Sequence, residues 1–162
     1  MIRRPPRTTQ SRSSAASDVY KRQDPVADNL YLSGSEIRDM KQFMIRQHLN
    51  YKDFSRNTVE YVSRNYGTES QVVFRIARSN TRFAEEVTHD GEILAEVVYA
   101  IQYENAKTLR DIMLRRTGIG TLGNPGKAVI DKIASLAAGM MGWSEKRKED
   151  EIASLIKVYD LF

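Results

Sequence analysis

Three acidic residues recur along residues 94–123, a segment whose apolar spacing predicts one long helix. Glu96 and Glu104 stand eight residues apart and Asp111 follows, so these carboxylates could act as an acid and a base in catalysis. We favour structural pairing, because Asp111 precedes Arg115 by four residues, the spacing at which opposite charges meet on a helix surface. Such an exposed pair stabilises a helix by roughly 0.3–0.5 kcal/mol. We therefore assign no catalytic residue.

Two adjacent arginines and a threonine, Arg115-Arg116-Thr117, end the predicted helix. The guanidinium groups could bind a phosphate. Arginines in the last turn of a helix also offset the helix dipole, an effect worth about 0.3–1 kcal/mol. We favour this second role, together with contacts to a neighbouring domain.

A glycine-rich run follows the arginines and spells G-x-G-x-x-G at Gly118, Gly120 and Gly123. In dinucleotide-binding proteins this pattern follows a strand and opens a helix, with an acidic residue about 20 positions later. Here it follows a helical segment, and Trp143-Ser144 stands where the acidic residue would be. The run therefore indicates a helix end and a loop, not a cofactor site.

Two further groups of side chains predict packing or surface features. Tyr99 and Tyr103, one helical turn apart, could form a stacking surface, but the packing of an amphipathic helix is the more common role. Lys146-Arg147-Lys148 runs directly into Glu149-Asp150-Glu151, which predicts a solvated face of mixed charge and not a phosphate site.

The composition limits the class of protein. A chain of 162 residues supports one modest domain with its own core. It has no cysteine, which excludes disulfides and thiolate metal sites and fits a reducing compartment. Its two histidines, His48 and His89, lack the spacing of metal ligands, and no apolar run approaches the roughly 20 residues of a membrane-spanning helix. We expect no metal and no cofactor on this chain.

The net charge of +4 is concentrated in the first residues. Residues 1–23 hold six of the 25 lysines and arginines but one of the 21 acidic residues, so the rest is close to neutral. Overall charge therefore gives the body of the chain no nucleic-acid role. The leader lacks the apolar segment of a secretory signal, and its SAASDVYKRQ stretch resembles a translated sequencing adapter, a contaminant of genes read from environmental DNA. We expect residues 1–23 to be disordered and non-native, and residues 24–162 to form the domain.

Beyond the leader the chain shows a series of helices with readable ends. Helix starts are predicted from capping signals at Ser33, Asp53 or Ser55, Thr68, Asp90, Asn124-Pro125 and Ser144. Helix ends are predicted at Gly67, Asn80 and Gly142. No run of five residues alternates as a strand would. We therefore predict an all-α fold, a single compact bundle of five to six helices around one core, with no sheet.

The same residues resemble a known family. The sequence is similar to the C-terminal helical domain of FAD-dependent glycerol-3-phosphate dehydrogenases at Glu96, Tyr99, Glu104, Thr108, Asp111, Arg115, Arg116 and Thr117. Gly142-Trp143-Ser144 before a charged helix, and Tyr66-Gly67 upstream, stand where this family has them. The resemblance covers roughly residues 30–162, which is all of the chain beyond the leader.

What the resemblance implies concerns a larger protein. Members of this family oxidise glycerol 3-phosphate to dihydroxyacetone phosphate and pass hydride to FAD and electrons to a quinone pool, in bacteria at the cytoplasmic face of the membrane. Their FAD-binding and substrate-binding domains lie upstream of the helical domain. The resemblance thus implies an inactive C-terminal fragment that carries no catalytic, flavin-binding or metal residue. Its eight family-pattern positions would hold the helical domain together or against the missing domains.

Two other functions fit parts of the sequence. One is a stand-alone helical module for protein interactions, which is consistent with the missing active site. The other is a small helical nucleic-acid binder that uses the basic leader, which the near-neutral body argues against.

Overall fold

A computed structural model describes residues 36–161. The leader and the predicted cap at Ser33 lie outside the described residues. Within them the predicted all-helical fold is confirmed: there is no strand, and an isolated bridge joins Glu86 to Ile93.

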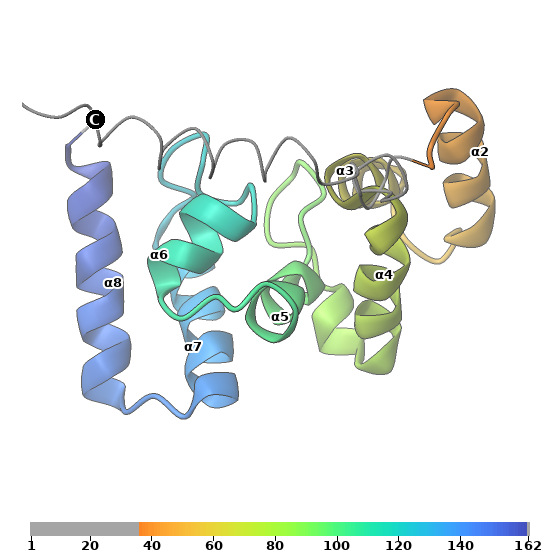
Figure 1. The fold of residues 1–162 in the computed structure, drawn as a ribbon. Helices are drawn as coiled ribbons and strands as arrows, with labels where there is room; N and C mark the ends of the chain where they lie inside the picture. The colour runs from red at the N-terminus through yellow and green to blue at the C-terminus, as the bar shows by residue number, and fades with distance from the viewer. Residues whose placement is uncertain (1–35, 162) are drawn as a thin grey trace, which may run out of the picture. The chain divides into compact units, whose positions relative to one another are not determined.

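The helices follow one another along the chain, with the longest connections at residues 80–93 and 117–126 (Figure 1). In order they are α2 (Met40–Asn50), α3 (Arg56–Tyr66), α4 (Ser70–Ser79), α5 (Leu94–Gln102), α6 (Leu109–Asp111), α7 (Lys127–Met141) and α8 (Glu145–Tyr159). Short 3-10 turns, Gly67–Glu69 and Thr81–Ala84, flank α4, and the π-helical turn Ile112–Arg116 continues α6. Helix α4 packs on α5, α5 on α7, and α8 on both α6 and α7.

Several predicted helix ends are confirmed. Ser55 caps α3 by accepting from the Thr58 N–H, and Ser144 caps α8 by accepting from the Arg147 N–H. Gly142 ends α7 in the left-handed conformation, at φ 65°. Gly67 and Asn80 likewise follow directly on the last residues of α3 and α4.

Three predicted helix starts are wrong. Thr68 does not cap α4, because a 3-10 turn leads straight from α3 into it. Helix α5 begins after Ile93 and not at Asp90. The Asn124 side chain accepts from the Gly126 N–H in a tight turn, so α7 begins two residues beyond Pro125, at Lys127.

The predicted long helix over residues 94–116 is also wrong, because it is broken between Gln102 and Leu109. Asn105 has a left-handed backbone, at φ 57°, and the Ala106 N–H donates to the Ala100 oxygen across the break. Thr108 then caps a new helix. The Thr108-x-x-Asp111 spacing is itself a capping signal, but the apolar period that continues across it concealed the break.

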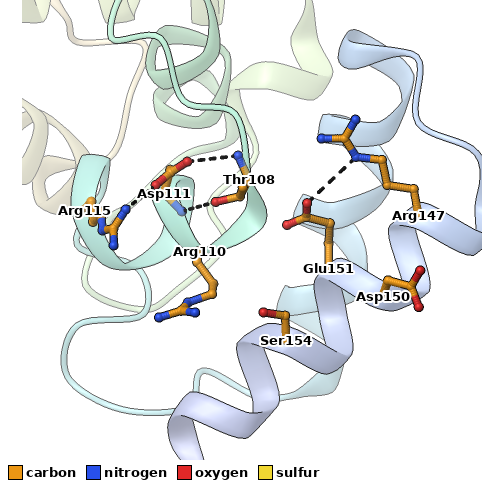
Figure 2. A pocket seen from close by; sticks show the side chains of 8 residues that line it. All are labelled: Thr108, Arg110, Asp111, Arg115, Arg147, Asp150, Glu151 and Ser154. Carbon is orange, nitrogen blue, oxygen red and sulfur yellow. Dashed lines mark hydrogen bonds and ion pairs between the residues drawn. The ribbon is translucent and has the colours of Figure 1, made fainter.

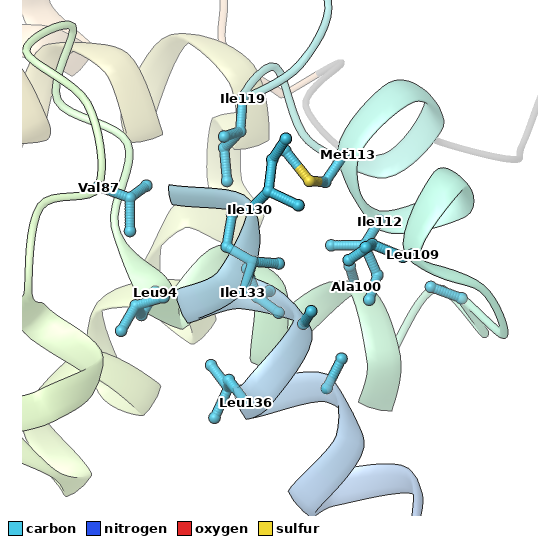
Figure 3. Close-up of a cluster of buried hydrophobic side chains, with 14 of the residues drawn as sticks. Val87, Leu94, Ala100, Leu109, Ile112, Met113, Ile119, Ile130, Ile133 and Leu136 are labelled. Carbon is cyan, nitrogen blue, oxygen red and sulfur yellow. The ribbon is translucent and has the colours of Figure 1, made fainter. Parts of the chain in front are cut away.

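Helix α5 lies between two buried clusters. The α5–α8 cluster gathers aliphatic side chains from α5, α6, the π-helical turn and α7, such as Leu94, Leu109, Ile112, Ile130 and Ile133 (Figure 3), together with Leu155 from α8. The α3–α5 cluster, on the other side of α5, gathers Val59, Val62, Val73, Phe74 and Tyr99 from α3, α4 and α5. All ten residues from Gly91 to Ala100 are buried, so α5 is the central element that both clusters share.

The loop before α5 is held against α3 by close backbone packing at Gly91. A Cβ on Gly91 would lie 2.6 Å from the Asn57 carbonyl carbon and 2.7 Å from the Thr58 nitrogen, and its φ is +104°. Since only glycine tolerates both the contact and this conformation, Gly91 fixes where α5 begins.

Candidate functional site

The start of α6 forms a closed set of polar contacts among the predicted residues. Thr108 Oγ1 accepts from the Asp111 N–H at 3.1 Å, and Asp111 Oδ2 accepts from the Thr108 N–H at 3.1 Å, which is a complete capping box. Arg115 Nη1 donates to Asp111 Oδ1 at 2.7 Å, as the four-residue spacing predicts. Burial alone would raise the pKa of Asp111, but its bonds to Thr108, Lys107 and Arg115 together lower it. Asp111 is therefore ionised, and both oxygens of its carboxylate already accept hydrogen bonds.

A second carboxylate reaches the start of α6 from the last helix. Glu151 of α8 accepts from the Leu109 N–H at 2.9 Å, and Arg147 Nε lies 3.9 Å from Glu151 Oε1 (Figure 2). The charged start of α8 is largely solvated as predicted, except that Glu151 satisfies a backbone donor 42 residues away.

The carboxylates of Glu151 and Asp111 border a cavity of about 380 Å³. Arg110, Arg115, Arg147, Asp150 and Ser154 also line it. The charges of its lining are mixed: Arg110 and Asp150 stand beside the ion pairs of Asp111 with Arg115 and of Glu151 with Arg147.

Glu96 lies at the buried start of α5. Its Oε1 accepts from the Ile93 N–H at 3.0 Å, and its Oε2 accepts from the Tyr66 hydroxyl at 3.1 Å. Its side chain has no exposure, and burial raises its pKa to about 8 although both hydrogen bonds act in the opposite direction. Glu96 thus satisfies two donors at a helix start that water cannot reach, and it does so largely in the protonated form at neutral pH.

The arginine turn, Arg115-Arg116-Thr117, faces Glu96 across a smaller cavity of about 250 Å³. Five of the eight predicted positions, Glu96, Glu104, Arg115, Arg116 and Thr117, line it together with Tyr61, Asn65, Tyr66 and Gly118. Thr117 is buried and closes the π-helical turn, because its N–H and its hydroxyl both donate to the Ile112 oxygen, at 3.0 and 2.8 Å. The side chains of Arg115 and Arg116 are exposed at the mouth of this cavity. The fold therefore brings together residues that are 21 positions apart in sequence.

Tyr99 lies beside this cavity in a row of aromatic rings. Tyr66 meets Tyr99 edge-on at 5.2 Å between ring centroids, and Tyr103 stacks on Tyr99 at 5.1 Å. Burial first, and then the charges of Glu69 and Glu104, raise the pKa of the Tyr99 hydroxyl. Tyr99 and Tyr103 therefore do stack, and Tyr99 also packs in the α3–α5 cluster.

A family model described as the C-terminal domain of alpha-glycerophosphate oxidase matches residues 25–148. The chain belongs to this family. The resemblance predicted from Glu96, Tyr99 and the Arg115-Arg116-Thr117 turn is thereby confirmed at the level of the family. The match spans α2 to the start of α8.

One curated relative, from Dictyostelium discoideum, is described as a probable mitochondrial glycerol-3-phosphate dehydrogenase. It is 27% identical to the chain over 138 residues. These cover 83% of the chain but 21% of the relative, so the chain spans about a fifth of the relative's length. No solved structure matches the chain.

The structure of this C-terminal domain shows polar contacts made by residues to which no sequence pattern pointed. Tyr61, Glu92 and Glu151 were not predicted, and Tyr66 was noted only as part of a Tyr-Gly pair. Glu92 is buried beside Tyr61, where burial and Glu92 together raise the pKa of the tyrosine hydroxyl. Their contacts join segments far apart in the chain, so no local spacing could have pointed to them.

The predicted interpretation of the glycine run is confirmed. Gly118, Gly120 and Gly123 lie in turns between the π-helical turn and α7, and no strand precedes them in the described part of the chain. A Cβ on Gly118 would overlap the Tyr61 hydroxyl, and one on Gly120 would overlap that of Tyr159. These two glycines therefore serve close packing.

No helix among residues 36–161 combines the length and the apolar character that crossing a membrane requires.

Proposed function

We propose that this C-terminal domain braces an enzyme that oxidises glycerol 3-phosphate to dihydroxyacetone phosphate with FAD, and that it carries no redox chemistry itself. The parent enzyme would hold its FAD-binding and substrate-binding domains upstream of these helices. It would deliver electrons to quinone while attached peripherally to the cytoplasmic face of a membrane. The family match over residues 25–148 supports the parent activity.

The observation that carries the structural role is the state of the predicted carboxylates. Asp111 is held by a capping box and an ion pair, and Glu96 satisfies two buried donors. Both border cavities, but each oxygen of the two carboxylates already accepts a hydrogen bond from the domain itself, so neither is placed to act as an acid or base on a bound molecule. We infer that these family-pattern positions maintain the shape of the domain against its upstream neighbours.

A fusion experiment tests this role. The matched segment of the Dictyostelium relative is replaced by the full 162-residue chain, and the fusion is compared with the native relative and with a truncated form that lacks the segment. We expect the fusion to bind flavin and to reduce a soluble quinone analogue with glycerol 3-phosphate, well above the truncated form.

The isolated chain provides the complementary measurement. Purified alone, it is expected to be helical by circular dichroism, colourless, and inactive toward glycerol 3-phosphate. Flavin that co-purifies with the isolated chain, or turnover by it, would contradict the proposal that the redox chemistry belongs to the upstream domains. A well-folded chain whose fusion is no better than the truncated form would instead favour a stand-alone interaction module.

A further inference from the structure

The small cavity that the arginine turn shares with Glu96 contains a polar atom without a partner. Glu104 is one of its lining residues, and the Oε2 atom of Glu104 is buried and accepts no hydrogen bond from any described residue. Burial raises the pKa of Glu104, although the nearby Arg116 opposes this. A buried acceptor without a donor is costly, so this oxygen calls for a bound group that can donate to it.

The mouth of the same cavity carries a cation without a partner. Arg115 is paired with Asp111, but the guanidinium of Arg116 makes no ion pair and no hydrogen bond with any described residue. Glu96, the other carboxyl of the lining, is largely protonated at neutral pH, because its pKa is about 8. The lining therefore offers an unpaired cation at the mouth and an unpaired acceptor inside. No direct ion pair joins the two, so a molecule in the cavity can contact both.

The backbone that presents Arg116 is held by an uncommon turn. The N–H and the hydroxyl of Thr117 both donate to the Ile112 oxygen, which closes the π-helical turn directly after Arg116. Such turns are rare and are found frequently at functional sites. An ordinary helix end would already place an arginine where it offsets the helix dipole. The turn therefore supports a further role for Arg116, at the cavity.

The volume of the cavity, about 250 Å³, limits the size of a ligand. A molecule of liquid water occupies about 30 Å³, so this volume corresponds to roughly eight waters. One ordered water would leave most of the space empty, and a nucleotide would not fit. The size thus points to a molecule with on the order of ten non-hydrogen atoms.

We propose that this cavity binds a small phosphomonoester that also carries a hydroxyl group. The phosphate would accept from the Arg116 guanidinium at the mouth, and the hydroxyl would donate to Glu104 Oε2 inside. Arginine suits this role because its fork of N–H groups matches the oxygens of a phosphate. Two sources share this chemistry, a free polyol phosphate and the headgroup of a lysophosphatidic acid. The ligand is bound and not converted here, so the inference does not rest on the proposed function.

The ligand chemistry is tested on the full chain with three soluble probes. Glycerol 3-phosphate, ethyl phosphate and glycerol are titrated separately into isotope-labelled protein at constant ionic strength and followed by NMR. We expect saturable shifts of the Arg116, Thr117 and Gly118 amide signals with glycerol 3-phosphate. Ethyl phosphate lacks the hydroxyl and should bind about tenfold more weakly, as the loss of a hydrogen bond to a charged group implies, and glycerol should not bind. Equal affinity for the two phosphates would overturn the proposal.

Vesicles distinguish the two sources of the ligand. Phosphatidylcholine vesicles with and without lysophosphatidic acid are sedimented with the chain. Binding of glycerol 3-phosphate without retention by either vesicle would support a free polyol phosphate. Retention only by the vesicles with lysophosphatidic acid would support the lipid headgroup. A chain that responds neither to the soluble probes nor to the vesicles would show that water alone fills the cavity, and the proposal would fail.

Matched variants identify the contributing groups. Arg116→Gln should weaken glycerol 3-phosphate by about tenfold, because it removes the charged donor. Glu104→Met removes the acceptor and should abolish the preference for glycerol 3-phosphate over ethyl phosphate. Arg110→Gln, at an exposed arginine that lines the larger cavity instead, should leave the affinity unchanged. Circular dichroism checks that each variant is folded. Unchanged affinity in Arg116→Gln, or an equal loss in Arg110→Gln, would contradict a specific site.

The fusion with the Dictyostelium relative keeps this inference apart from the proposed function. An inactive fusion, with intact binding of glycerol 3-phosphate by the isolated chain, would remove the proposed function but not the cavity site. An active fusion, with no binding by the isolated chain, would remove the cavity site and leave the proposed function standing.

Discussion

The two clusters on either side of α5 differ in what they bury. The α5–α8 cluster consists almost entirely of aliphatic side chains, with Trp143 at its edge. The α3–α5 cluster contains Phe74 and Tyr99, and Tyr51, Phe54, Tyr61 and Tyr66 pack against it. Buried polar side chains are concentrated in the same elements, at Thr58, Ser63, Ser70 and Glu96. The α5–α8 side therefore buries mainly apolar side chains, whereas the α3–α5 side buries aromatic and polar ones as well.

This difference indicates where the domain is sensitive to its surroundings. Aliphatic burial does not depend on pH, whereas a buried carboxyl does. The polar side also borders the small cavity that Arg115 and Arg116 line. We therefore expect the two clusters to differ in how mutation and pH change the free energy of unfolding.

The largest effect is expected in the α5–α8 cluster. Ile133→Ala removes a fully buried side chain on α7 and should lower the free energy of unfolding by about 2–5 kcal/mol. The loss should vary little between acidic and alkaline pH, because the buried side chains of this cluster are all apolar. Urea unfolding at several pH values measures it. A loss that varies strongly with pH would show that the two clusters are not energetically distinct.

Glu96→Gln, on the α3–α5 side, should change the stability of the domain by an amount that depends on pH, in contrast to Ile133→Ala. The native pKa of Glu96 is raised from 4.5 to about 8, so between these values the unfolded chain releases a proton that the native state retains. The stability that Glu96 contributes is thus complete below pH 4.5 and falls by up to about 1.4 kcal/mol per pH unit until pH 8. The glutamine variant lacks this loss, so its stability relative to the natural chain should rise across that range. Parallel pH profiles of the two proteins would contradict the assignment.

Gly91→Ala tests the backbone contact that joins the loop before α5 to α3. The added methyl would clash with the backbone of Asn57 and Thr58 at a positive φ, which should cost about 1–3 kcal/mol of stability. Thermal unfolding followed by circular dichroism measures this, with Gly139→Ala as a control because a Cβ there meets nothing within 4 Å. Equal melting temperatures for the two variants would show that the loop can move away at no cost.

The smallest effect concerns the start of α6. Thr108→Ala removes a capping oxygen and should cost about 1 kcal/mol, whereas Arg115→Ala removes an exposed ion pair and should cost about 0.3–0.5 kcal/mol. Urea unfolding of both single variants and of the double variant measures each cost and their coupling through Asp111. The reverse order of costs would mean that the ion pair, not the capping box, holds this helix start.

The sequence predicted what depends on local spacing. The all-helical fold follows from apolar periods and caps, and Ser55, Gly142 and Ser144 are where those signals place them. The Asp111–Arg115 pair is equally local. The break after α5 was missed because the apolar period on either side of Asn105 stays in phase, which hides a change of chain direction.

The parts of the site that could not be predicted depend on tertiary packing. Glu151 reaches Leu109 across 42 positions, and Tyr66 reaches Glu96 across 30. The sequence named Glu96 as a member of a pattern, but its protonated, buried state results from tertiary packing around the start of α5, where the Tyr66 side chain of α3 reaches it. Burial of this kind is a property of the assembled domain and leaves no local signature.

The π-helical turn at Ile112–Arg116 holds one residue more than a turn of α-helix does. Its closing bond joins Thr117 to a residue five positions back, where an α-helix would join residues four positions apart. Deleting Leu114 would therefore place Thr117 at the α-helical spacing from Ile112, where it could keep the same bond. The residues that follow would keep their direction, and Arg116 would still border the small cavity with Glu96. The turn thus takes up one extra residue without redirecting the chain beyond it.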